Sequence, residues 1–239
     1  MRNVAELTRR ELAATFLSPI AYIVLVVFVM LPGYVLSEIL IRRMATADMT
    51  PVVHLMAWVL LFISPMLAMR LFADEFQSGT IEPLMTAPVT TLEVVLSKYL
   101  ASLFFLLTAL VPTFVYAAVL FQIGRPDPGP VLAGYLGLFL LGAYFLAVGM
   151  VASACVRTQI AAAVITIVLL LTLQTLGTMV PSDATDTLSR VARYLSYWEH
   201  FVAVFAKGII DTRDVVFFVS HCAFCVFLTS VIVAVRRWR

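Results

Sequence analysis

The chain has 239 residues, of which 62% are hydrophobic and 13% charged, and its mean hydropathy is +1.03. Soluble domains average about 25% charged residues, so this composition excludes an ordinary soluble globule. The net charge of +2 comes from scattered Lys and Arg without a basic stripe, so no nucleic-acid partner is expected. No polar half or Ser/Gly-rich linker divides the chain, and residues 1–239 are expected to form a single membrane domain.

Residues 1–18 precede the first long apolar stretch. Val4, Leu7, Leu12 and Phe16 recur at loosely helical spacing, which favours a short interfacial helix lying on the membrane before Pro19 turns the chain inward. A frayed terminus is the alternative interpretation. The apolar run is too long for a cleavable signal and no cleavage pattern follows it, so the first membrane helix is expected to stay in the mature protein.

Six stretches contain no Lys, Arg, Asp or Glu and are long enough to cross a hydrocarbon core, which takes about 20 residues of helix. They are Leu12 to Ser37, Met49 to Met69, Tyr99 to Gly124, Pro128 to Val156, Thr158 to Ser182 and Val215 to Val235. They are apolar on every side, whereas a membrane strand alternates apolar and polar residues. The sequence therefore predicts an all-α, polytopic membrane protein with six transmembrane helices.

The distribution of basic residues predicts the orientation. With both termini cytoplasmic, the inside connections carry nine of the 16 Lys and Arg residues: Arg2, Arg9, Arg10, Arg70, Lys98, Arg157, Arg236, Arg237 and Arg239. An even number of helices puts both ends on one side, and both ends are basic. The expected location is a bacterial cytoplasmic (inner) membrane.

The connection formed by residues 73–92 is longer than a turn and is expected to be cytoplasmic. Gly79 is expected to end one helical segment, and Thr80 to cap a second, with Glu82 in its first turn. Pro83 is early enough to be tolerated, and Pro88 stops this short helix. The pattern predicts a helix held parallel to the membrane, after which Thr90 and Glu93 form a capping box for the third membrane helix.

The connection formed by residues 183–214 lies on the opposite side. Leu188, Val191, Ala192 and Leu195 have helical spacing, and an aromatic segment follows that includes Trp198, Phe201 and Phe205. This pattern favours a helical segment that dips into the outer leaflet. A surface loop with an aromatic belt is the alternative.

Two smaller patterns concern helix packing. Gly134, Gly137, Gly142 and Gly149 are expected to let the fourth membrane helix pack closely against its neighbours. Gln174, a polar residue within the fifth, can form a hydrogen bond with a neighbouring helix.

The segment from Ala73 to Thr90, Ala-Asp-Glu-Phe-Gln-Ser-Gly-Thr-Ile-Glu-Pro-Leu-Met-Thr-Ala-Pro-Val-Thr, resembles the coupling helix of type 2 ATP-binding-cassette (ABC) permeases. The likeness extends over nearly the whole chain and is greatest to the branch of the gliding-motility and nitrous-oxide-reductase-maturation permeases. It implies six helices in each half, pairing of two halves, and docking of the connection into a separate ATPase. Glu75, Gly79, Thr80 and Glu82 match the coupling motif of that family. The residues that we assign to ATPase coupling are Asp74, Glu75, Gly79, Thr80, Ile81, Glu82, Pro83, Leu84 and Pro88. Pro83 departs from the Leu typical of the family.

The resemblance also implies that residues 183–214 form a re-entrant outer gate, to which we assign Trp198, Phe201 and Phe205. The expected partners are an ABC ATPase subunit, a second copy or a related permease, and membrane lipid, with an extracytoplasmic accessory protein as a further candidate.

No phosphate-binding loop or catalytic constellation occurs in the sequence, so an enzyme is not expected. No cofactor of the chain itself is expected either, and ATP would be bound by the partner. His221, Cys222 and Cys225 form a metal-like cluster without a fourth ligand, and packing inside the sixth helix is the preferred interpretation. The leading function is that of an ABC exporter permease. The alternatives are a non-transporting anchor or force transmitter, and a secondary transporter, against which the absence of charged residues in the six runs argues.

Overall fold

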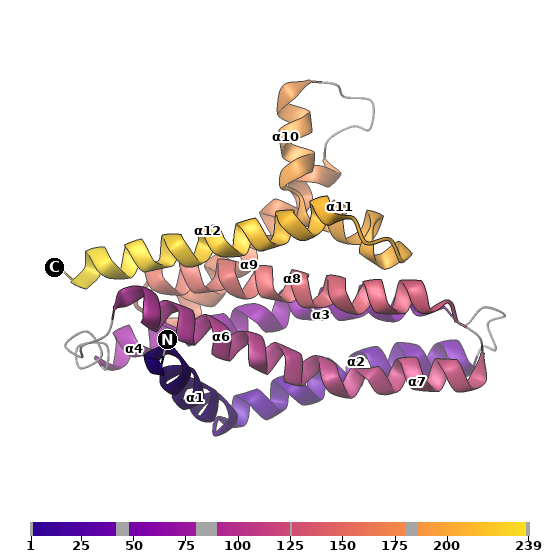
Figure 1. Cartoon of the computed structure of the whole chain (residues 1–239), viewed down its shortest axis with the longest axis horizontal. Helices are drawn as coiled ribbons and strands as arrows, with labels where there is room; N and C mark the ends of the chain where they lie inside the picture. Colours follow the sequence, from indigo (N-terminus) through magenta and orange to yellow (C-terminus); the bar gives the residue numbers. More distant parts are fainter. Residues whose placement is uncertain (1, 42–47, 80–89, 125, 180–185, 238–239) are drawn as a thin grey trace.

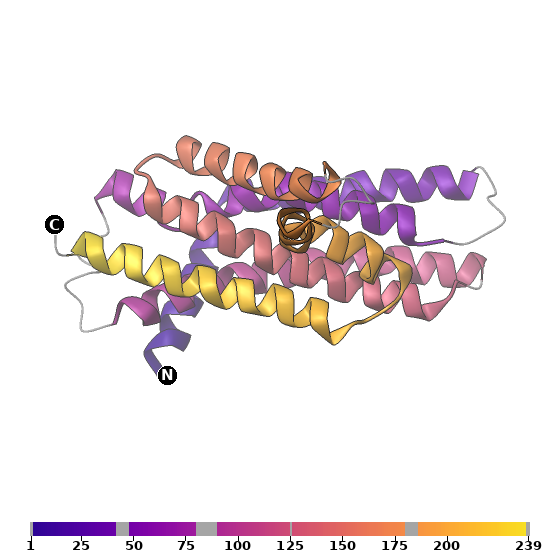
Figure 2. The same ribbon diagram turned by 90° about the horizontal axis from the view of Figure 1, so that it is seen from above.

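The computed structural model describes residues 2–41, 48–79, 90–124, 126–179 and 186–237, and every regular element within these ranges is a helix. The elements in chain order are α1 (Arg2–Phe16), α2 (Pro19–Ile41), α3 (Thr50–Ala68), α4 (Ala73–Ser78), α6 (Thr91–Leu110), η1 (Val111–Thr113), α7 (Phe114–Ile123), α8 (Pro128–Cys155), α9 (Gln159–Thr178), α10 (Thr187–Leu195), α11 (Tyr197–Ala203), η2 (Phe205–Lys207) and α12 (Thr212–Arg237). The long helices lie side by side in one bundle, with both termini and α4 toward the same end (Figures 1 and 2). We call this the termini end.

Six helical stretches in the described ranges are long and apolar enough to cross a membrane. They are α2, α3 with α4, α6 with η1 and α7, α8, α9 and α12. The predicted fold class and six membrane-spanning helices are therefore confirmed.

The boundaries of the first and third spans differ from the apolar runs in the sequence. The run that begins at Leu12 is divided between α1 and α2, because α1 ends at Phe16 and Pro19 starts α2, where a proline needs no hydrogen-bond acceptor. The third span already begins at Thr91. It changes to a short 3₁₀ turn at Val111–Thr113, where Pro112 cannot donate to the helix, and continues as α7.

Helix α8 forms the centre of the bundle, and its glycines allow neighbouring helices to approach closely. A Cβ atom on Gly137 would lie 2.5 Å from Cβ of Phe205, and one on Gly149 would lie 2.4 Å from Cβ of Ala68. A Cβ on Gly142 would lie 2.7 Å from the Leu106 side chain. These positions have no space for any side chain, which confirms the close packing predicted for the fourth membrane helix.

In the described part of the connection between α9 and α12, the short helices α10 and α11 run in different directions. Helix α10 projects sideways from the bundle, and Figure 2 shows it almost end-on. Helix α11 lies against the bundle, where the buried Tyr197 hydroxyl is 3.1 Å from both the Leu170 carbonyl and the Gln174 amide oxygen. The hydrogen bond predicted for Gln174 is therefore present. Burial raises the pKa of Tyr197, so the hydroxyl keeps its proton for these acceptors.

Candidate functional site

Helix α4 begins with a cap that comes from another part of the chain. The N-cap residue Phe72, which precedes α4, provides no side-chain cap. The hydroxyl of Ser153 on α8 instead accepts hydrogen bonds from the backbone N–H groups of Phe72 and Ala73 at 3.1 and 2.9 Å. The same hydroxyl donates to the carbonyl of Met69 at 3.1 Å. Because Ser153 is fully buried, this hydrogen-bond set fixes the start of α4 to the central helix.

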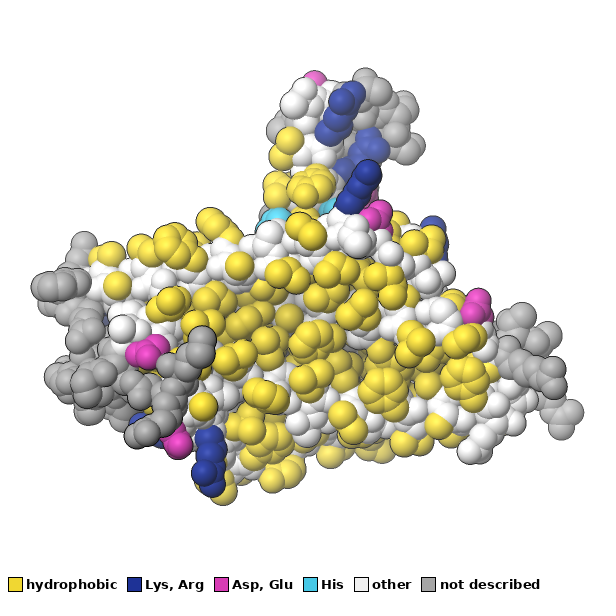
Figure 3. All heavy atoms as spheres, in the orientation of Figure 1, with side chains coloured by type: hydrophobic (Ala, Val, Ile, Leu, Met, Phe, Trp, Pro, Cys, Tyr) yellow, Lys and Arg dark blue, Asp and Glu magenta, His cyan; other side chains and the backbone are white. Residues whose placement is uncertain are grey.

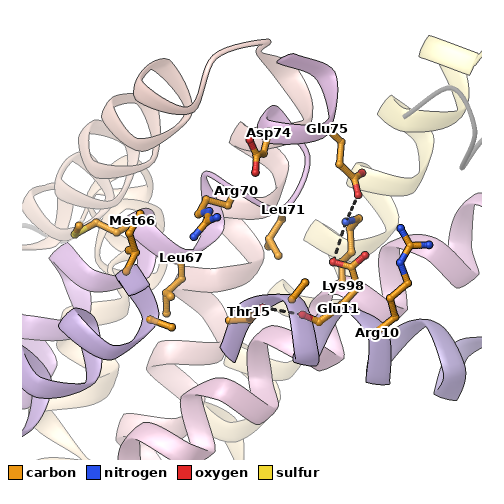
Figure 4. Close-up of a pocket in the computed structure, with 13 residues that line it drawn as sticks. Arg10, Glu11, Thr15, Met66, Leu67, Arg70, Leu71, Asp74, Glu75 and Lys98 are labelled. Atoms are coloured by element: carbon orange, nitrogen blue, oxygen red, sulfur yellow. Dashed lines mark hydrogen bonds and ion pairs between the residues drawn. The ribbon is translucent and has the colours of Figure 1, made fainter. Parts of the chain in front are cut away.

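A charge cluster joins α4 to α1 and α6. The ammonium group of Lys98 lies 2.6 Å from a carboxylate oxygen of Glu75 and 3.1 Å from one of Glu11 (Figure 4). The Lys98 side chain is only 2% exposed, and it also lies over the buried Phe72 ring at 5.5 Å. A buried ammonium needs paired charges and hydrogen bonds, which the two carboxylates supply.

Two further contacts hold α4 from α9 and α12. The side-chain amide of Gln159 donates a hydrogen bond to Asp74 at 2.6 Å. The guanidinium of Arg236 lies 4.6 Å from the centre of the Phe76 ring and also donates to the Cys155 carbonyl. Helix α4, although only six residues long, therefore contacts polar or charged groups from α6, α8, α9 and α12, and reaches α1 through Lys98.

A cavity of ≈ 220 Å³ lies between α1, α2, α3, α4 and α6 at the termini end. Its charged lining residues are Arg10, Glu11, Arg70, Asp74, Glu75 and Lys98 (Figure 4). Arg70 donates a hydrogen bond to Ser18, in the turn between α1 and α2, at 2.5 Å. The cavity thus lies between the turn after α3 and the N-terminal helix, and its lining carries three basic and three acidic side chains.

The predicted coupling residues fall partly within this site. Asp74 and Glu75 both line the cavity, and each holds a partner from another helix. Gly79 ends α4 in the left-handed conformation, with φ of 73°, as the sequence predicted for this helix end. Thr80, Ile81, Glu82, Pro83, Leu84 and Pro88 lie outside the described residues. The capping box of Thr90 and Glu93 at the start of α6 is confirmed.

The three aromatic residues assigned to an outer gate do not share one environment. Phe201 and Phe205 are fully buried and pack against α8 at Gly137, rather than lining an exposed aromatic belt. Trp198 is only partly buried and contacts α3, with its ring 5.1 Å from Trp58 and 6.4 Å from His54, and the Phe201 ring lies 6.5 Å from the same histidine. The glycine at position 137 accounts for the difference, since it opens a space on α8 that the two phenylalanine rings fill.

Next to these aromatic residues, α11 is joined to α12 by a histidine and a buried carboxylate. Nδ1 of His200 lies 2.5 Å from the Asp214 carboxylate, and Nε2 lies 3.0 Å from the Tyr194 carbonyl in α10. This contact fixes the two short helices to the start of the sixth span.

Comparison with models of known protein families identifies the family of this chain. Residues 42–198, about two thirds of the chain, match the model of a family described as ABC-2 family transporter protein. The chain belongs to this family. This ABC-2 protein is therefore a membrane subunit of an ABC transporter and a multi-pass membrane component rather than a nucleotide-binding domain. A search of curated proteins finds no match to the ABC-2 chain. The matched region includes α3, α4 and the connection that follows α4.

Sequence reasoning missed most of the residues that hold α4 in this ABC-2 protein. Ser153, Gln159 and Arg236 were not singled out for this role, and Lys98 was counted only as a basic residue. One signal was available for Lys98, because it lies seven residues inside α6 and no other charged residue follows it up to Ile123. An ionisable residue in that position needs a partner, although the sequence does not say which.

Proposed function

We propose that this chain is the permease subunit of an ABC exporter, that it forms the translocation path together with a second copy or a related permease, and that a separate ATPase drives it. The observation that carries this proposal is the anchoring of α4, which directly precedes the predicted coupling residues 80–88 in the sequence. The family match supports the role of membrane subunit.

The contacts of α4 provide a route for coupling. A displacement of the connection by the ATPase would act on α4 and, through Lys98, Ser153 and Arg236, on α6, α8 and α12. ATP binding to the partner would then favour one arrangement of these helices over another, as any ligand does that binds two states unequally. In this proposal the termini end faces the cytoplasm, and Trp198, Phe201 and Phe205 belong to the opposite, outer side.

Co-purification of the tagged chain with its candidate ATPase tests the coupling role. Glu82→Arg is expected to abolish recovery of the ATPase and permease-dependent ATP hydrolysis in lipid nanodiscs, because it reverses a charge in the docking motif. The control is Asp186→Arg, a charge reversal at an exposed position next to α10, which is expected to leave both unchanged.

Gel-filtration profiles identify variants that have lost the fold. If the folded wild-type chain recovers no ATPase, the coupling proposal is wrong. A non-transporting membrane anchor that works without an ATPase, or a secondary transporter, would then take its place.

A further inference from the structure

A long groove lies between α6 and α12, with α8 as its floor. Its volume is ≈ 470 Å³, more than twice that of the cavity beside α4. Leu96 and Leu103 line it from α6, Ala143 from α8, and Ala223 and Phe227 from α12. In Figure 3, hydrophobic side chains cover the face of the bundle that carries α6 and α12 in Figure 1, and charged groups gather toward the ends and on α10.

The chemistry of the lining excludes water as the occupant. The polar side-chain groups are the Tyr99 hydroxyl, which already donates to the Ala143 carbonyl at 3.1 Å, and the Cys222 thiol. A bound water needs two to four polar partners, and these residues do not provide them. An empty groove would leave its apolar walls without contacts, so the groove requires an apolar occupant.

The position and length of the groove indicate which apolar group this is. It starts at Leu92, the second residue of α6 at the termini end, and reaches Leu103. Eleven helical residues span about 16 Å, close to half of the roughly 30 Å hydrocarbon core of a bilayer. The groove is therefore about as long as one leaflet is deep.

The rim of the groove lies in the part of the molecule that faces hydrocarbon. Val219 and Phe227 are 54% and 63% exposed and belong to the sixth membrane span. In a bilayer, lipid tails are as apolar as the walls of this groove, so no hydrophobic driving force favours a second copy of the chain over lipid here.

We propose that the groove between α6 and α12 is a binding site for one acyl chain of a membrane phospholipid from the leaflet at the termini end. The occupied groove holds α6 and α12 at their present separation. Since α6 also carries Lys98, a bound lipid favours the arrangement of helices in which α4 is anchored. The inference depends on the membrane location of the chain and not on its coupling to an ATPase.

Native mass spectrometry of the protein released from nanodiscs tests the site. Ala223→Phe places an aromatic ring in the groove, whereas Ala234→Phe makes the same change on the same helix outside the groove lining. The wild type and Ala234→Phe are expected to retain a single phospholipid per chain. In Ala223→Phe the retained fraction is expected to fall at least about tenfold, which corresponds to about 1.4 kcal/mol of binding free energy.

A phosphatidylcholine that carries a photoreactive diazirine in its acyl chain locates the bound lipid. The label is expected on peptides that contain residues 92–103 and 219–227, and to be lost from them in Ala223→Phe. Ala223→Leu, a smaller intrusion, replaces Ala223→Phe if that variant does not fold. Equal lipid retention in the Ala223 and Ala234 variants would overturn the proposal. So would disulfide formation between two copies of Ala223→Cys, because the groove would then be covered by protein.

Discussion

Lys98 is the residue at which charged groups of three helices around α4 meet. Its buried ammonium lies between Glu75 and Glu11 and over the ring of Phe72. The two glutamates come from different helices, and without the lysine they would face each other as like charges. The net effect of the cluster on stability therefore depends on keeping all three groups together.

Lys98→Met is expected to lower the free energy of unfolding by about 3 kcal/mol, because it leaves two partly buried carboxylates without their counter-charge. Thermal unfolding in detergent, followed by gel filtration with fluorescence detection, measures the change. Lys207→Met, at an exposed position, is the control and is expected to have little effect. The triple variant Glu11→Gln, Glu75→Gln, Lys98→Met is expected to recover much of the loss. An unchanged melting temperature for Lys98→Met alone would contradict this account of the cluster.

Among the helices, α8 leaves the least space for added atoms, because neighbouring elements on several sides contact its backbone. Gly137 faces Phe205 of η2, and Gly149 faces Ala68 of α3. In both cases the nearest atom is a Cβ, which cannot move without its backbone.

Gly137→Ala and Gly149→Ala are each expected to destabilise the protein by about 1–3 kcal/mol, since the new methyl group forces helices apart. Gly33→Ala in α2 is the matched control, because its added Cβ would meet only the end of the Tyr116 side chain, at 3.3 Å. Its effect is expected to stay within about 0.5 kcal/mol. The same unfolding measurement ranks the three variants, and equal effects at all three positions would show that close packing of α8 is not the cause.

The elements show what local sequence rules can predict. Charge-free length identified six spans, and the turn rules placed the end of α4 at Gly79 and the capping box at Thr90. These features depend on neighbouring residues only. The division between α1 and α2 depends on Pro19, which is predicted from the sequence to turn the chain into the membrane, whereas the apolar run from Leu12 alone does not separate the two helices.

The candidate site was less predictable because it is built from distant residues. The family resemblance identified Asp74 and Glu75, but their partners are Gln159 and Lys98, and no local pattern specifies such pairs. The aromatic segment shows the same limit. Its composition suggested an interface, whereas Phe201 and Phe205 are buried because α8 has a glycine opposite them.

For the whole molecule, the orientation in the membrane can be tested with a native residue. Cys155 is exposed at the end of α8, close to Arg236 at the termini end. A charged, membrane-impermeant maleimide is expected to modify Cys155 in inverted membrane vesicles and not in right-side-out vesicles, because the basic termini are expected to be cytoplasmic.

The reverse pattern would show that the predicted topology is wrong. Ile210→Cys in a Cys155→Ser background is the complementary control, since Ile210 is exposed in the connection before α12 and is expected to react only from the outside.

The contacts around α4 also bear on how the protein is made. Glu11, Glu75, Lys98, Ser153 and Arg236 are synthesised in this order, so Glu11 in the N-terminal helix can pair with its lysine only after the third span has begun to form. Among these contacts, the one between Arg236 and Phe76 forms last, because Arg236 follows all the other residues in the sequence. A chain that is truncated before this arginine would insert its earlier spans but hold α4 incompletely. The α4 site is therefore complete only after the sixth membrane span has been inserted, so its assembly depends on the insertion of all six spans.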